Sequence, residues 1–229
     1  MVASADDALL WSRLWLDDAP SHLNAALASA ARPRQLVDGE LLYARGDTAA
    51  GLIGVRRGII RNVHVAADGR ELLFGLFTAG SWFGEISLFD DAPRPLHAYA
   101  MGETEVITLP SAAFHAVLEA HPQGYRHFAR VLCHKLRVAF EVLEDQSRPL
   151  SLRLAKRLLD LAVVYGQPQP EGLLLNLPLP QEDLARMLAA TRQSINKELR
   201  ALGQQGLLTI KKGQVVLHNP EALKALIAG

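Results

Sequence analysis

The sequence predicts an α+β protein of 229 residues, and three stretches carry that prediction. Between residues 34 and 109, short apolar runs alternate with glycine-containing turns, which is typical of an antiparallel barrel or jelly roll. Between residues 125 and 143, apolar residues recur at intervals of four and three, which indicates a long amphipathic helix. Between residues 180 and 217, two short helical patterns precede a β-hairpin, which indicates a small mixed domain.

The N-terminal half begins with helical patterns and continues as the β domain. Residues 6–31 have apolar residues at helical spacing, with a break at Asp17–Pro20, so we expect two short helices packed against the β domain. Within the β domain, Asp68-Gly69 lies between two apolar runs and is the clearest hairpin signal.

A long helix is expected after the break at His121-Pro122. One of its stripes has coiled-coil spacing and is predicted to contact a second copy of the chain: Tyr125, Ala129, Leu132, Leu136, Ala139 and Leu143. Phe128, Val131, Val138 and Val142 form a second stripe. One stripe can face the β domain while the other faces a partner helix, so we predict a parallel homodimer. The alternative is a helix buried on both faces within one subunit.

The C-terminal part starts near Gln146–Pro149. A helix from Ser151, as its cap, to Tyr165 is expected first. A loop at Gly166–Pro170 and a strand at Leu173–Leu177 come next, and the strand is expected to join the sheet of the later hairpin.

The stretch from Pro180 to Leu208 divides into two helical patterns joined at Ala189-Ala190-Thr191. In the second pattern Ile195, Leu199 and Leu202 form one buried stripe, and Thr191 is the expected N-cap. This is the construction of a helix-turn-helix, whose second helix enters the DNA major groove. The hairpin after Leu207, with its basic turn, makes it a winged helix.

The polar face of the second helix is predicted to bind DNA. Arg192 and Gln193 are expected to read base edges, and Lys197 and Arg200 to contact a base or a phosphate. Lys211 and Lys212, at the tip of the wing, are expected to bind the DNA backbone. The predicted DNA-binding residues are Thr191, Arg192, Gln193, Asn196, Lys197, Arg200, Lys211 and Lys212. The alternatives are a helical bundle with a solvated charged face, and a winged helix that binds protein.

Charge is distributed unevenly along a chain whose net charge is zero. Residues 1–146 carry 13 Lys/Arg and 18 Asp/Glu, whereas residues 147–229 carry 11 and 6, so the halves have charges of −5 and +5. A basic second half favours a polyanionic partner there.

The single cysteine, Cys133, excludes an intramolecular disulfide framework and a four-cysteine iron-sulfur centre. The acidic N-terminus offers no signal or membrane span, so we expect a cytoplasmic protein with no membrane partner.

Three stretches resemble the family of the cyclic-AMP receptor protein and the fumarate-nitrate reduction regulator, bacterial transcription factors. They are LLYARGD, DGRELLFGLFTAGSWFGEISLFDDAPR at residues 68–94, and the winged helix, in the family's order. The resemblance implies a β-roll sensor domain, a long dimerisation helix and a winged helix, with RNA polymerase as a further partner. The domains expected are residues 1–120, 121–147 and 148–229.

The resemblance also implies an effector pocket, formed by Gly84, Glu85, Ile86, Ser87 and Arg94. In relatives that bind cyclic nucleotides, the glycine turn and the matching Arg hold the phosphate, and the matching Glu takes the ribose hydroxyl. A competing hypothesis is that Glu85 and Arg94 form an internal ion pair.

Two departures from the family's pattern disfavour cyclic AMP as the effector. Pro95 replaces a hydroxyl residue after the Arg and supplies neither hydroxyl nor N–H, and Leu96 is bulkier than the usual Ala. The stretch Val138-Ala139-Phe140 lacks the hydroxyls that relatives offer to adenine from the long helix. The effector is therefore left open, with cyclic nucleotides disfavoured.

Haem binding and enzymatic activity are two further alternatives. Some relatives sense gases through haem, and His97, beside the pocket, is the first candidate ligand. The eight histidines show no i, i+4 pair and no ligand cluster of the kind that holds zinc. No nucleophile elbow, metalloprotease helix, phosphate loop or dinucleotide fingerprint occurs, so no enzyme is expected.

Overall fold

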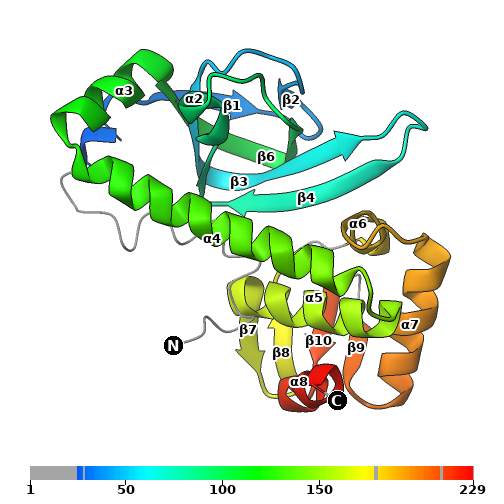
Figure 1. Ribbon diagram of the computed structural model, residues 1–229. Coiled ribbons are helices and arrows are strands. Elements are labelled where there is room, and N and C mark those ends of the chain that lie inside the picture. Colours follow the sequence, from blue (N-terminus) through cyan, green and yellow to red (C-terminus); the bar gives the residue numbers. More distant parts are fainter. Residues whose placement is uncertain (1–24, 28, 178–179, 212–213, 229) are drawn as a thin grey trace. The chain divides into compact units, whose positions relative to one another are not determined.

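The computed structural model describes residues 25–228, apart from residue 28 and the pairs 178–179 and 212–213. The described chain divides between Arg137 and Val138 into two compact units (Figure 1). Most of the helical region expected before residue 32 lies outside the described residues, as does Lys212. Among the described residues, no helix is long and apolar enough to cross a membrane.

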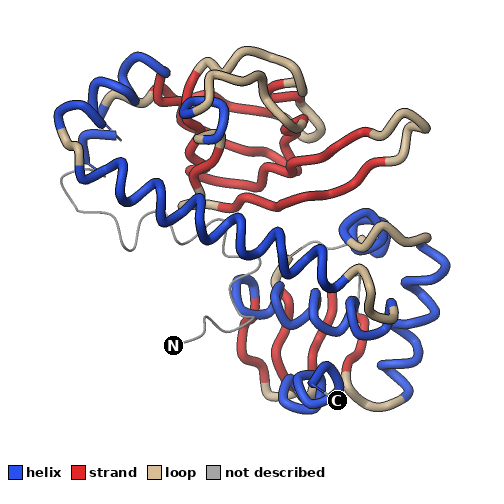
Figure 2. The backbone as a smooth tube through the Cα atoms, viewed as in Figure 1, coloured by secondary structure: helices blue, strands red, loops and turns tan. Residues whose placement is uncertain are grey.

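The first unit is built on one six-stranded antiparallel sheet. Its path runs β1-β6-β3-β4, while β2 pairs with β6 and β5 pairs with β3. The strands are β1 (Arg32–Leu36), β2 (Leu41–Tyr43), β3 (Gly51–Val65), β4 (Glu71–Thr78), β5 (Trp82–Phe83) and β6 (His97–Pro110). The hairpin expected at Asp68-Gly69 is confirmed, because Val65 pairs with Glu71 on either side of that turn. Figure 2 shows β3 and β4 as a long two-stranded extension of the sheet.

Two apolar clusters hold this unit together. One lies within the curved sheet, where Phe77 and Phe83 stack with their ring centroids 4.4 Å apart. The other joins the sheet to α3 (Ser111–Ala120) and to α4 (Gln123–Asp145), through Phe114 of α3 and Phe128 of α4. The two ring centroids lie 5.1 Å apart in an edge-to-face contact, so the first half of α4 is a packed part of this first unit.

The second unit is a winged helix. It contains α5 (Leu150–Tyr165), β7 (Gly166–Gln169), β8 (Gly172–Leu175), α6 (Gln181–Met187), α7 (Arg192–Gln204), β9 (Leu208–Lys211), β10 (Gln214–Leu217) and α8 (Pro220–Ala228). The four strands form one sheet in the order β7-β8-β10-β9, so the strand predicted after Gly172 does join the sheet of the wing.

Two local predictions for this unit were wrong. The segment from Gly166, expected to be a loop, is strand β7, paired with β8. It contains Pro168, which an edge strand tolerates because one side of the strand makes no ladder hydrogen bonds. Helix α5 begins at Leu150 after Pro149, so Ser151 lies inside the helix and does not cap it.

Candidate functional site

The turn between α6 and α7 is held by backbone hydrogen bonds. Ala189 has φ +48. The Ala190 N–H donates to the Ala185 carbonyl at 3.0 Å, which is the 6→1 hydrogen bond of a Schellman motif at the end of a helix. The Thr191 hydroxyl oxygen then accepts a hydrogen bond from the Ser194 N–H at 3.1 Å. The predicted joint and the predicted N-cap are therefore both confirmed, and α7 starts at Arg192.

Helix α7 separates an apolar face from a polar face. Ile195, Leu199 and Leu202 are buried, as their spacing predicts. On the other side lies an open depression, which is lined by Arg192, Gln193, Ser194, Asn196, Lys197, Arg200, Ala201 and Gln204. Three of these side chains are cationic and none is anionic, so the depression presents positive charge and amide groups to solvent.

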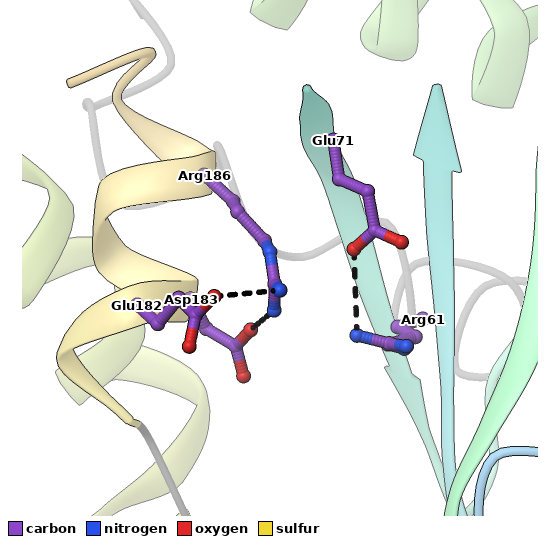
Figure 3. Close-up of polar contacts among 5 residues, drawn as sticks. All are labelled: Arg61, Glu71, Glu182, Asp183 and Arg186. Carbon is purple, nitrogen blue, oxygen red and sulfur yellow. Dashed lines mark hydrogen bonds and ion pairs between the residues drawn. The ribbon is translucent and has the colours of Figure 1, made fainter. Parts of the chain in front are cut away.

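Two carboxylates of α6 are paired within that helix. Arg186 donates to Glu182 and to Asp183, each at 2.9 Å, as Figure 3 shows. The acidic pair lies in the first turn of α6, where negative charge is favourable. Figure 3 also shows the Arg61–Glu71 pair of the β3–β4 hairpin, with its charged atoms 3.8 Å apart. On α6 the charge of Arg186 is therefore offset by its two carboxylate partners, whereas the depression on α7 has no carboxylate in its lining.

The wing of the second unit is a short antiparallel hairpin in which Lys211 pairs with Gln214. This register places Lys211 at the end of β9. His218 supports the base of the hairpin, because its ring nitrogens lie 3.1 Å from the Thr209 hydroxyl and 2.6 Å from the Glu171 carbonyl.

The five residues predicted to form an effector pocket lie around one small cavity of the first unit. Gly84, Glu85, Ile86, Ser87 and Arg94 all line it, together with Tyr43, Asn62, Phe77, Phe83, Pro95, Leu96 and Lys135. Gly84 has φ +94, and a Cβ at that position would collide with the Arg94 guanidinium. Only glycine therefore fits at this turn while Arg94 occupies its place.

Arg94 is buried and is bound by the chain itself. Its guanidinium donates to the Gly84 carbonyl at 2.7 Å and to the Gly51 carbonyl, and it lies 4.6 Å from the centre of the Tyr43 ring. Burial lowers the pKa of Arg94, while it raises the pKa of Tyr43 to about 12. The residue expected to hold a phosphate thus holds two backbone carbonyls.

Glu85 pairs with a lysine of α4. The Lys135 ammonium lies 2.6 Å from Glu85 Oε1, and the two residues are 9% and 1% exposed. The hypothesis of a Glu85–Arg94 ion pair is therefore wrong, because each of the two groups has a different partner. Sequence reasoning missed Lys135, although its position continues the buried stripe of Val131 and Val138 at intervals of four and three.

The remaining space in this pocket is small, and it contains unpaired acceptors. The cavity volume is about 60 Å³. Sites for drug-sized ligands and cofactors usually have volumes of roughly 300–1,000 Å³. Among the described residues, Glu85 Oε2 and Asn62 Oδ1 are buried without a hydrogen-bond partner. In this conformation the pocket has no room for a cyclic nucleotide.

The two stripes of α4 differ sharply in exposure. On the predicted dimer stripe, Tyr125, Leu136 and Leu143 are 44%, 54% and 68% exposed. On the other stripe, Phe128 and Val138 are buried. A helix buried on both faces within one subunit does not fit these exposures, whereas an apolar stripe left open for a partner does.

Histidines do not form a metal centre in the part of the chain that the structure describes. No group of three or more His, Cys, Asp or Glu side chains there could hold a metal ion. His97, the candidate haem ligand, accepts a hydrogen bond through Nδ1 from the Arg45 N–H at 3.2 Å.

Three features together define a DNA-binding transcription regulator: a β domain with a buried Gly-Glu-Arg pocket, a long helix with an open apolar stripe, and a winged helix. Residues 33–121 match the family model of the cyclic nucleotide-binding domain, and residues 152–226 match that of the Crp-like helix-turn-helix domain. The chain belongs to the family of the cyclic-AMP receptor protein and the fumarate-nitrate reduction regulator, and it is a DNA-binding transcription regulator.

The chain is similar to known proteins over nearly its whole length. The chain is 28% identical over 200 residues to the CRP-like cAMP-activated global transcriptional regulator of Mycobacterium tuberculosis, covering 87% of this chain and 89% of that protein. It is 27% identical over 214 residues to the anaerobic regulatory protein of Bacillus subtilis, covering 90% and 88%. The structure of FixK2 from Bradyrhizobium japonicum has the same fold, with a TM-score of 0.76 at 23% identity, covering 87% of this chain and 98% of that one.

Proposed function

We propose that this regulator binds a near-palindromic operator as a homodimer and responds to an effector other than cyclic AMP. The observation that carries the DNA contact is the capped helix α7, with its exposed, cationic and amide-bearing face. We divide the chain into a sensor domain at residues 1–120, a dimerisation helix at 121–147 and a DNA-binding domain at 148–229. In this proposal RNA polymerase is a further partner. The protein then works in the cytoplasm, where the chromosomal DNA lies.

In this proposal the polar residues of α7 and of the wing contact different parts of the DNA. Arg192 makes a bidentate contact with guanine, and Gln193 makes one with adenine. Asn196, Lys197 and Arg200 contact further bases or phosphates, while Lys211 and Lys212 bind the backbone from the wing. Relatives of the cyclic-AMP branch carry Glu at the position of Gln193. A carboxylate accepts from cytosine, whereas an amide both donates and accepts, so the preferred half-site shifts.

The dimer is proposed to form along the exposed stripe of α4. Leu136 and Leu143 expose large apolar side chains at heptad spacing, which is the arrangement that a second copy of the same helix covers. Two parallel copies present two recognition helices to one face of DNA. The half-sites are then expected one helical turn, about 34 Å, apart.

The contacts inside the pocket disfavour cyclic AMP as the effector. The M. tuberculosis relative is named as cAMP-activated, but in this chain Lys135 holds Glu85, two carbonyls hold Arg94, and the cavity is about 60 Å³. A phosphate that took Arg94 would leave the Gly84 and Gly51 carbonyls without that donor. Each unpaired buried acceptor costs about 1–3 kcal/mol.

Selection of bound sequences from random DNA, followed by titration of the best operator, tests the DNA contact. Arg192→Ala is expected to weaken operator binding by roughly 5- to 150-fold, because a bidentate Arg–guanine contact contributes about 1–3 kcal/mol. Lys224→Ala is the matched control, since it removes one positive charge from α8 of the same unit. A change of less than twofold for Arg192→Ala would contradict the assignment, and so would binding that does not weaken as salt rises.

Calorimetry with cyclic AMP and cyclic di-GMP, together with a visible absorption spectrum for haem, tests the effector. We expect no heat signal with cyclic AMP. A signal with cyclic AMP that disappears in Arg94→Ala would contradict the proposal.

A further inference from the structure

The carbonyl at the end of α6 has a partner from another helix. Leu188 is the C-cap of α6, and its carbonyl accepts a hydrogen bond from Arg153 Nη2 of α5 at 2.9 Å. The last carbonyls of a helix have no partner within the helix, and a cationic side chain is favourable at that end. Arg153 therefore holds the residue that comes immediately before the helix-turn-helix turn.

That turn has a conformation that needs support from its surroundings. Ala189 comes directly after Leu188 and lies in the left-handed region at φ +48, which residues other than glycine rarely adopt. Such a conformation persists where neighbouring contacts fix it. The recognition helix begins three residues later, at Arg192. A small rotation at Leu188 or Ala189 therefore reorients the whole of α7.

The other arm of Arg153 binds the segment after α4. Arg153 Nη1 donates to Gln146 Oε1 at 2.8 Å, while its Nε is buried with no hydrogen-bond partner in the described part of the chain. Lys156, one turn further along α5, lies 2.5 Å from Asp145 and 3.9 Å from Glu141, both at the end of α4. The guanidinium thus joins the end of the dimerisation helix to the turn that aims the recognition helix.

We infer that Arg153 is a positioning residue for DNA recognition, which fixes the helix-turn-helix turn through the Leu188 carbonyl and links it to the end of α4 through Gln146. It makes no contact with DNA itself. This inference depends on the proposed contact between α7 and DNA. Loss of Arg153 should change how well α7 fits its operator, and not how strongly the basic unit is attracted to DNA in general.

The test compares full-length Arg153→Gln and Arg153→Lys with Arg148→Gln. Arg148→Gln removes the same charge from the same segment, where Arg148 lies 3.4 Å from Asp145. Binding is measured to the selected operator and to random-sequence DNA at one salt concentration, and thermal unfolding is recorded for each variant. Arg153→Lys keeps the charge but cannot bridge two acceptors with a planar fork. It is a second variant that still tests the inference if Arg153→Gln fails to fold.

We expect both Arg153 variants to lose about tenfold in operator affinity, while their affinity for random DNA changes less than twofold. We expect Arg148→Gln to stay within twofold on both DNAs. Equal losses on operator and random DNA would overturn the inference, as would unchanged operator binding or an equal loss for Arg148→Gln. Failure of the proposed function gives a different result, because the wild-type protein would then show no preference for any sequence.

Discussion

Replacing Lys135 by Met removes one half of a buried ion pair and leaves the other half in place. Glu85 is 1% exposed, its Oε1 lies 2.6 Å from the Lys135 ammonium, and its Oε2 has no hydrogen-bond partner among the described residues. In Lys135→Met the carboxylate keeps its burial and loses this cation. Breaking a buried pair in this way costs about 3–5 kcal/mol, whereas an exposed pair contributes at most about 1 kcal/mol.

Urea denaturation followed by tryptophan fluorescence measures this effect in the relevant part of the chain. All three tryptophans, Trp11, Trp15 and Trp82, precede α4, so the signal reports on the N-terminal half. We expect Lys135→Met to lower the free energy of unfolding by about 3–5 kcal/mol. Adding Glu85→Gln should recover a substantial part of the loss, because the unpaired charge is then gone.

The matched control is Arg57→Met, which breaks the exposed Arg57–Glu103 pair on the same sheet. We expect that variant to lie within about 0.5 kcal/mol of wild type. A loss below about 1 kcal/mol for Lys135→Met would refute the reasoning, because it would mean that Glu85 does not depend on this cation. An equal loss in the double variant would also refute it.

Three further predictions concern the dimer, the recognition helix and pH. Leu136→Glu places a charge on the exposed α4 stripe and should convert dimers to monomers in sedimentation equilibrium; an unchanged dimer would exclude that stripe as the interface. Thr191→Ala removes the N-cap of α7 and should lower stability by about 1 kcal/mol in thermal unfolding, with Thr191→Ser restoring it. Burial raises the pKa of Asp160 to about 7, so the folded state binds a proton that the unfolded state releases near pH 4. This proton stabilises the folded state fully below pH 4, and the stabilisation is lost as the pH rises to about 7. Asn does not titrate, so the free energy of unfolding of Asp160→Asn minus that of wild type should increase over this range. A difference independent of pH would contradict the assignment.

Local patterns predicted most of the fold because the forces that set them are local. The spacing of Ile195, Leu199 and Leu202 fixes which face of α7 is buried, and the Thr191 side chain caps the helix through a residue three positions away. The Asp68-Gly69 turn likewise determines the register of β3 and β4. Each of these features requires only neighbours in the chain.

The contacts inside the pocket could not be predicted in the same way. Glu85 and Lys135 are 50 positions apart, and the Gly51 carbonyl that binds Arg94 is 43 positions away from it. Such pairs depend on how α4 and the strands pack, which spacing within one element does not specify. Strand β7 illustrates the same point, because pairing with β8 overrides the turn preference of a segment that contains Pro168.

Under the proposed function, the pocket contacts also constrain how an effector would bind. In this conformation Arg94 and Lys135 already have partners within the chain, while Glu85 Oε2 and Asn62 Oδ1 are acceptors without donors among the described residues. A ligand that brings anionic oxygens must separate existing buried pairs before it gains any contact. A ligand that brings N–H or O–H donors can satisfy the two free acceptors and leave those pairs intact. Under the proposed function, the pocket therefore selects for hydrogen-bond donors, while Arg94 and Lys135 stabilise the fold of this unit through their contacts within the chain.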